Sequence, residues 1–96
     1  MPVVAVIEGL TEEQYEESVR KVSGGKRRVE SPSDWPVEGL MAHVAGQGKS
    51  GFRVVDFWES EEAWNKFVDG TIRPLMEEMG VQVKPEVYTV HTFVSA

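Results

Sequence analysis

The chain has 96 residues, of which 41% are hydrophobic, and it carries a formal net charge of −6 at pH 7. A chain of this length builds one modest core, so a single domain over residues 1–96 is expected. The acidic balance argues against nucleic-acid binding, and the absence of cysteine excludes a disulfide framework, a thiolate metal site and a cysteine nucleophile. The apolar stretch 1–7 is too short to span a membrane and lacks a basic leader, so we expect no membrane contact and a cytoplasmic location.

The N-terminal residues predict a strand followed by a helix. Residues 3–8 are β-branched on both alternating faces, which is typical of a central strand covered on both sides. Thr11 and Gln14 have the form of a capping box, so the helix is expected to begin at Glu12. Its apolar positions recur at helical spacing, and Ser23-Gly24-Gly25 ends it.

Residues 23–38 contain several Pro and Gly residues and no sustained period, which predicts a loop longer than most in compact domains. Loops of this length are typically lids or binding segments. The alternative is a solvated connection in which Trp35 packs down onto the domain, held by Pro36.

Two further strand signals, residues 40–46 and 51–59, flank the sequence Gly-Gln-Gly-Lys-Ser-Gly and predict a hairpin. This connecting sequence matches the form of the Gly-x-Gly-x-x-Gly dinucleotide-binding fingerprint, and it contains Gly-Lys-Ser. That fingerprint binds phosphates only where a strand opens into a helix, whereas here a strand follows. We therefore expect a glycine-rich turn without nucleotide affinity.

A second helix is predicted after the third strand. Ser60 is placed to cap its first amides, and an apolar stripe continues along it: Trp64, Phe67, Val68, Ile72, Leu75, Met76 and Met79. Gly70 and Pro74 lie within the stripe, and because proline removes a backbone donor, a kink or a two-piece helix is expected there. Residues 86–94 alternate as a fourth strand, which would contain His91.

The order β-α-β-β-α-β predicts a ferredoxin-like α+β fold, with an antiparallel sheet in the order 4-1-3-2 and both helices on one face. The other face would stay uncovered and would carry either Val55 and Phe57 or Phe52 and Trp58, depending on which side chains point outward. An apolar patch of this kind marks a protein interface, so we expect a homodimer formed sheet to sheet.

With this order of elements, the strand-to-helix run Val-Val-Asp-Phe-Trp-Glu-Ser-Glu-Glu-Ala-Trp-Asn-Lys-Phe resembles the dimeric α+β barrel superfamily that includes the antibiotic-biosynthesis monooxygenases. The resemblance covers nearly the whole chain and implies a barrel closed between two subunits, with a pocket between the helices and sheet of each. It also implies a range of activities. Some members oxidise quinol-like substrates without metal or flavin, some degrade haem, and many have no assigned activity.

The haem-degrading branch resembles the chain less well. That branch uses an Asn on the first strand, a Trp in the second helix region and a His further along the chain. Residues 3–8 contain no Asn, and Trp64 or Phe67 is the candidate for the aromatic position. Met76, Glu77 and Glu78 stand where the His would be sought, so the axial ligand is missing.

The predicted hairpin brings together the pair of residues with most chemical promise. A turn centred on Gly48 and Lys49 places His43 opposite Val54, with Asp56 as its diagonal neighbour on the same face. A neutral His oriented by a carboxylate is a reasonable general base for deprotonating a phenol or quinol, so His43 and Asp56 are the candidate catalytic residues. A loop with one residue more or fewer would place the two side chains on opposite faces of the sheet. The structural alternative is a buried His whose hydrogen bond to Asp serves only the core.

The remaining candidates could hold a ligand. Trp58, Trp64 and Phe67 form an aromatic group next to the expected pocket, although a helical stripe needs such residues for the core in any case. His91 could approach a site only across a dimer or at a pocket end. Two histidines without short spacing and without cysteine do not predict a metal site, and no cofactor is expected.

Two functions are consistent with these observations. The first is a small homodimeric module that binds a small aromatic ligand or has no catalytic activity. The second is a cofactor-independent monooxygenase that acts on a quinol- or phenol-like substrate. An open cavity of a few hundred Å³ beside His43 or Asp56, roughly the size of ordinary ligand sites, would favour the enzyme.

Overall fold

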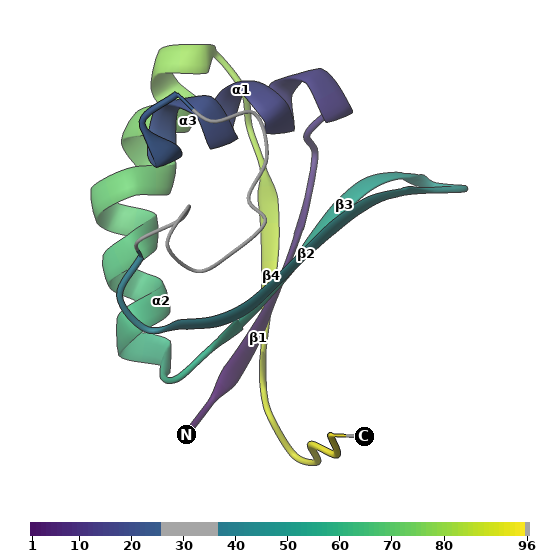
Figure 1. Ribbon diagram of the computed structural model, residues 1–96, viewed down its shortest axis with the longest axis vertical. Coiled ribbons are helices and arrows are strands. Elements are labelled where there is room, and N and C mark those ends of the chain that lie inside the picture. The colour runs from purple at the N-terminus through teal and green to yellow at the C-terminus, as the bar shows by residue number, and fades with distance from the viewer. Residues whose placement is uncertain (26–36, 96) are drawn as a thin grey trace.

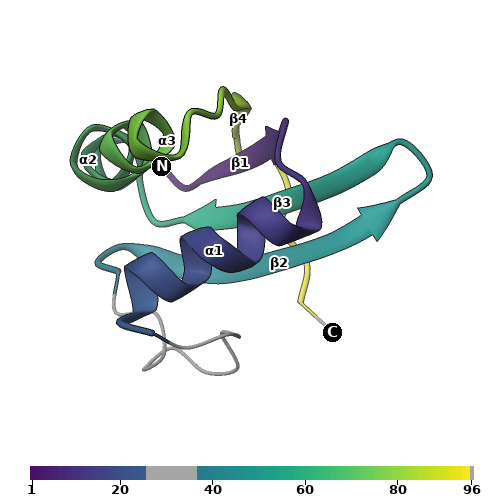
Figure 2. The same cartoon turned by 90° about the horizontal axis from the view of Figure 1, so that it is seen from above.

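The computed structural model describes residues 1–25 and 37–95, so the predicted packing of Trp35 lies outside the described part. The elements follow in the order β1 (Val3–Glu8), α1 (Glu12–Ser23), β2 (Leu40–Gly48), β3 (Gly51–Trp58), α2 (Glu61–Phe67), η2 (Val68–Ile72), α3 (Arg73–Met79) and β4 (Lys84–Thr89). The four strands form one antiparallel sheet in the order β2-β3-β1-β4. This confirms the ferredoxin-like order, and all helices lie on one face of the sheet (Figures 1 and 2).

Side-chain caps fix where the helices begin. The Thr11 amide donates to Gln14 Oε1 over 2.9 Å, and the Gln14 amide donates to Thr11 Oγ1 over 3.1 Å, which completes the expected capping box. The Ser60 hydroxyl accepts from the Ala63 amide over 3.1 Å and caps α2 in the same way. Each such cap contributes about 1 kcal/mol of stability.

The second helical region is divided where a break was expected. Between α2 and α3 the chain makes a π-helical turn, η2, in which the Arg73 amide donates to the carbonyl of Val68. Pro74 follows directly at the start of α3 and has no amide to donate, so the regular bonding pattern is interrupted. Single π-turns of this kind frequently occur at functional sites.

The core lies between the helices and the inner face of the sheet. Alternation along β1 and β3 turns one set of side chains inward, where they are buried together with residues of the helices: Val3, Ala5, Ile7, Val19, Phe52, Val54, Trp58, Trp64 and Phe67. Full burial of an aliphatic side chain of this kind contributes about 1.5–3 kcal/mol. The opposite set, which includes Val55 and Phe57, points to the face that no helix covers.

The hairpin register differs from the expected one. Gly48 pairs with Gly51, so the turn is centred on Lys49 and Ser50, one residue later than predicted, and β2 extends to Gly48. Gly51 has a φ of 124°, a conformation that favours glycine, and this places the end of the turn at that residue. The prediction that His43 faces Val54 was therefore wrong in register. Because the shift moves pairing partners by an even number of residues, it preserves the face on which each side chain lies.

The fourth strand is displaced from its predicted range. β4 runs from Lys84 to Thr89 and pairs with β1 alone, and Thr89 lies opposite Val3, the first residue of β1. Beyond Thr89 the Val90 amide donates one further backbone hydrogen bond to the Pro2 carbonyl, and β1, which begins at Val3, extends no further. The expectation that His91 belongs to the fourth strand was therefore wrong.

Candidate functional site

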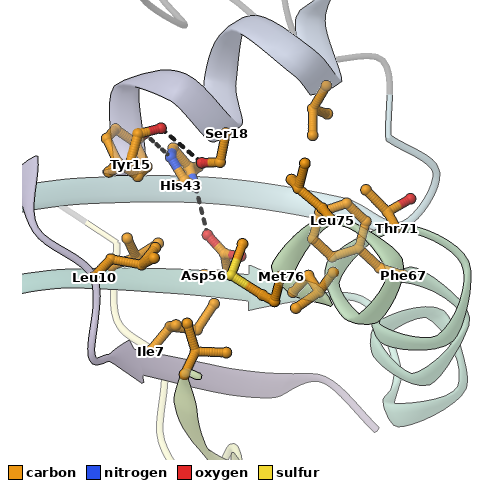
Figure 3. A pocket seen from close by; sticks show the side chains of 14 residues that line it. Ile7, Leu10, Tyr15, Ser18, His43, Asp56, Phe67, Thr71, Leu75 and Met76 are labelled. Carbon is orange, nitrogen blue, oxygen red and sulfur yellow. Dashed lines mark hydrogen bonds and ion pairs between the residues drawn. The ribbon is translucent and has the colours of Figure 1, made fainter. Parts of the chain in front are cut away.

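His43 and Asp56 lie directly opposite each other on β2 and β3, on the inner face of the sheet. His43 Nδ1 and Asp56 Oδ1 are 2.6 Å apart (Figure 3), and the side chains are 11% and 3% exposed. Since a carboxylate only accepts hydrogen bonds, Nδ1 carries the proton in this contact. The carboxylate thereby fixes the orientation of the imidazole and leaves Nε2 to face away from the sheet.

Tyr15 of α1 continues this chain of hydrogen bonds. Its hydroxyl lies 2.5 Å from His43 Nε2, and the two rings are stacked with centroids 5.8 Å apart. When the imidazole is neutral, Nε2 is an acceptor, and the phenol is the donor. Burial, and secondly the negative charge of Asp56, raise the pKa of Tyr15 to about 12, so the phenol keeps its proton at neutral pH.

An apolar cavity of about 50 Å³ adjoins these three residues. Among the described residues that line it, Asp56 carries the only carboxylate and no lysine or arginine is present. The apolar lining includes Ile7, Leu10, Phe67, Leu75 and Met76 (Figure 3), together with Val22, Val54, Ile72 and Val83. Ser18, whose hydroxyl donates to the Tyr15 carbonyl over 2.6 Å, also lies on the wall. The cavity holds a few heavy atoms and is smaller than ordinary ligand sites of about 300–1,000 Å³.

The aromatic candidates separate into two groups. Phe67 lines the cavity, whereas Trp58 and Trp64 belong to the core beside it, with Trp58 0% exposed. The Trp58 ring centroid lies 5.0 Å from that of Phe67 and 5.8 Å from that of Trp64. Trp58 Nε1 is buried without a hydrogen-bond partner in the described part of the chain. The packing of these rings is that of a core cluster.

His91 lies apart from the other candidates. It follows β4, is exposed, and has its Nδ1 2.7 Å from the hydroxyl of the adjacent Thr92. Within residues 1–25 and 37–95, no three His, Cys, Asp or Glu side chains are grouped in a way that would hold a metal ion.

Tyr15 is the functional candidate that the sequence reasoning missed. In the sequence it is one apolar position of the first helix, with the same helical spacing as Val19 and Val22, and this pattern predicts packing against the core. The usable signal was its hydroxyl, since a buried phenol needs a hydrogen-bond partner and a helix over the sheet offers few partners other than His43.

Solved structures similar to the chain share its fold. A protein from Deinococcus radiodurans, assigned provisionally to the antibiotic biosynthesis monooxygenases, is 11% identical with a TM-score of 0.59 and covers 100% of this chain and 98% of its own. A point mutant of SnoaB, a cofactor-independent oxygenase from Streptomyces nogalater, is 10% identical with a TM-score of 0.58, covering 99% of this chain and 96% of its own. A dimeric ferredoxin-like protein from an uncultured marine organism is 18% identical with a TM-score of 0.56, covering 99% and 92%.

No family model and no curated protein matches the sequence. The structural likenesses therefore show the fold: the chain has the ferredoxin-like α+β fold that these solved structures share, as the sequence resemblance implied. Within the described residues, no helix is both long enough and apolar enough to cross a membrane.

Proposed function

We propose that this protein binds a small aromatic molecule with a hydroxyl group in the cavity beside His43, Asp56 and Tyr15. The observation that carries the proposal is the chain of hydrogen bonds from buried Asp56 through His43 to Tyr15, placed at the wall of an otherwise apolar cavity. Ligand sites combine apolar walls with a few fixed polar groups in this way. The Tyr15 phenol marks the position that a ligand hydroxyl would take.

The binding reaction is an exchange of donors at His43. A ligand hydroxyl displaces the Tyr15 hydroxyl from Nε2, and the ligand ring takes the space that the phenol ring leaves, together with the adjoining cavity of about 50 Å³. Asp56 keeps the imidazole in the tautomer that accepts at Nε2, so the acceptor is already oriented before the ligand arrives. Preorganisation of this kind lowers the entropic cost of binding.

A second function, cofactor-independent oxygenation of a phenol- or quinol-like substrate, is favoured by the Asp56–His43 contact. A His held by a carboxylate acts as a general base. In an anthrone-like substrate, His43 Nε2 takes a proton from the activated CH₂ group, and the resulting carbanion is oxidised by O₂. One oxygen atom enters the new C=O group and the other leaves as water. The likeness in fold to a cofactor-independent oxygenase supports this candidate.

The same proposal includes a homodimer formed through the outer face of the sheet. Val44 is 65% exposed on that face, Tyr88 is half exposed, and Phe57 packs against the exposed Phe93 with ring centroids 5.1 Å apart. A fold neighbour is described as dimeric. Apolar side chains gathered on an uncovered sheet face favour association with a second copy.

The test is an NMR titration of the histidine ring signals with 1-naphthol. We expect saturable shifts of the His43 signals, and at least about tenfold weaker binding in His43→Ala, because one buried hydrogen bond is lost. His91→Ala is the matched control and should bind like the wild type. If wild-type His43 does not respond to the ligand, the pair serves only the core and the proposal is wrong. Oxygen uptake with anthrone, present in His91→Ala and lost in His43→Ala, would establish the oxygenase.

A further inference from the structure

A second, larger hollow lies against the cavity at His43. This groove has a volume of about 360 Å³ and runs between the helical region η2–α3 and the segment that leads into β4. Its lining is mostly apolar and also includes Arg73 and Glu77 of α3 and Gln82. The cavity and the groove have four lining residues in common: Ile7, Ile72, Met76 and Val83. These four side chains therefore adjoin both spaces.

Met76 is the member of this group that can move. It is 8% exposed, and in Figure 3 its side chain extends from α3 toward the side of Asp56. The other three shared residues are β-branched, and their side chains are stiff at the first torsion. Methionine is unbranched and has three rotatable bonds, so it can change rotamer at small cost. A rotation of Met76 would join the cavity to the groove, and the joined space reaches the size of an ordinary ligand site.

Resting on the function proposed above, we propose that the cavity and the groove form one binding site for an elongated, uncharged alkylphenol-like ligand, with Met76 between its two parts. The hydroxyl of the ligand bonds to His43 Nε2, and its alkyl chain passes Met76 into the groove. The structure thus assigns the site a ligand with a donor at one end and an apolar tail at the other.

The charges around the inner end favour an uncharged ligand. Asp56 is 2% exposed and carries the only carboxylate among the described residues that line the cavity, and these include no lysine or arginine. An anion placed at Nε2 would lie close to this carboxylate in a region of low dielectric. The Tyr15 phenol, which lies beside Nε2, has its pKa raised to about 12 by burial and by the charge of Asp56. At the outer end Arg73 is exposed and 3.6 Å from Asp69, so it does not offer a buried cation to a ligand acid.

The proposal is tested by NMR titration of the His43 ring signals with phenol, 4-ethylphenol, 4-butylphenol and 4-hexylphenol. 4-Butylbenzoate, which carries a carboxylate in place of the hydroxyl of 4-butylphenol, is the negatively charged control. Each added CH₂ group that enters the groove should tighten binding about fourfold, corresponding to about 0.8 kcal/mol. 4-Butylbenzoate should bind at least about tenfold more weakly than 4-butylphenol, because its charge meets Asp56.

Two variants separate the parts of the site. Gln82 is exposed and lines the groove, so Gln82→Trp should fill the groove from the surface and remove the gain with chain length while leaving phenol binding unchanged. Gln82→Ala is its control and should keep the gain. Met76→Ala should strengthen binding of the long phenols relative to phenol, and Met79→Ala, on the same helix but outside both spaces, should not.

The outcomes distinguish this proposal from the one on which it rests. Phenol binding that depends on His43 but does not tighten with chain length would overturn the composite site alone. A chain-length gain that survives Gln82→Trp would do the same. If none of the phenols binds, both proposals are wrong.

Discussion

Asp56 and His43 face each other across β3 and β2, and their 2.6 Å contact ties the inner face of the sheet to α1 through the Tyr15 hydroxyl. An ionised carboxylate that is 2% exposed is costly to bury without partners, so the pair matters for folding as well as for ligands.

A double-mutant cycle measures the worth of this pair. His43→Leu leaves Asp56 buried without its partner and should lower the free energy of unfolding by about 3–5 kcal/mol. The double variant His43→Leu/Asp56→Leu removes both polar groups and should recover much of that loss, giving a coupling of about 1–3 kcal/mol. Urea unfolding followed by tryptophan fluorescence provides the numbers. Additive losses would show that the two side chains do not stabilise each other.

The raised pKa of Tyr15 predicts a loss of stability in alkali. Below pH 10 the phenol is protonated in both states, whereas between its ordinary pKa of 10.0 and the folded-state pKa of about 12 the unfolded state ionises first. Since the folded state then binds more protons, stability should fall as the pH rises through this window. In Tyr15→Phe this part of the fall should be absent. The measurement is the unfolding midpoint of the wild type and of Tyr15→Phe over the same series of pH values. Identical pH dependence in the two proteins would contradict the prediction.

Replacing Asp56 should lower the pKa of Tyr15 toward its ordinary value. Burial is the larger cause of the rise and remains in Asp56→Asn, while the second cause, the negative charge, disappears. Ultraviolet titration of the phenol at high pH, in a Tyr88→Phe background that leaves Tyr15 as the only tyrosine, reports this value directly. An unchanged titration would mean that Asp56 does not act on the phenol.

The outer face of the sheet should hold two copies together. Light scattering at micromolar concentration should give a mass near twice the 10.8 kDa of the chain, since a standard interface of about 1,600 Å² is stable there. Val44→Glu places a charge on this face and should produce monomers. Lys66→Glu, on the exposed side of α2, is the control and should stay dimeric. A monomeric wild type would rule out this interface.

The glycine-rich turn between β2 and β3 should bind no nucleotide. No helix begins there, so neither amides nor a helix dipole are directed at a phosphate group. Titration with ATP and with NAD should produce no heat and no change in melting temperature. Saturable binding that is lost in Lys49→Ala would show that the fingerprint is functional after all.

The sequence by itself determined the elements and their order. Thr11 with Gln14, Ser60 and Pro74 act within a few residues of their own position, through caps or a missing donor, so their effects could be predicted without the fold. The inner placement of His43 and Asp56 was also within reach, because the two-residue period of a strand fixes relative faces once the parity of the turn is set. The ferredoxin-like sheet order follows from the sequence of elements.

Only the tertiary structure decided how these parts meet. The pairing of His43 with Asp56, the end of β4 at Thr89 and the contact with Tyr15 all depend on which partner lies opposite, and that is set by packing between segments distant in the chain. The sequence pattern shows that Tyr15 is apolar enough for a core, but not that its hydroxyl meets an imidazole. The position of Met76 in the lining of both the cavity and the groove is likewise a property of side-chain volumes packed in three dimensions, which no local periodicity records.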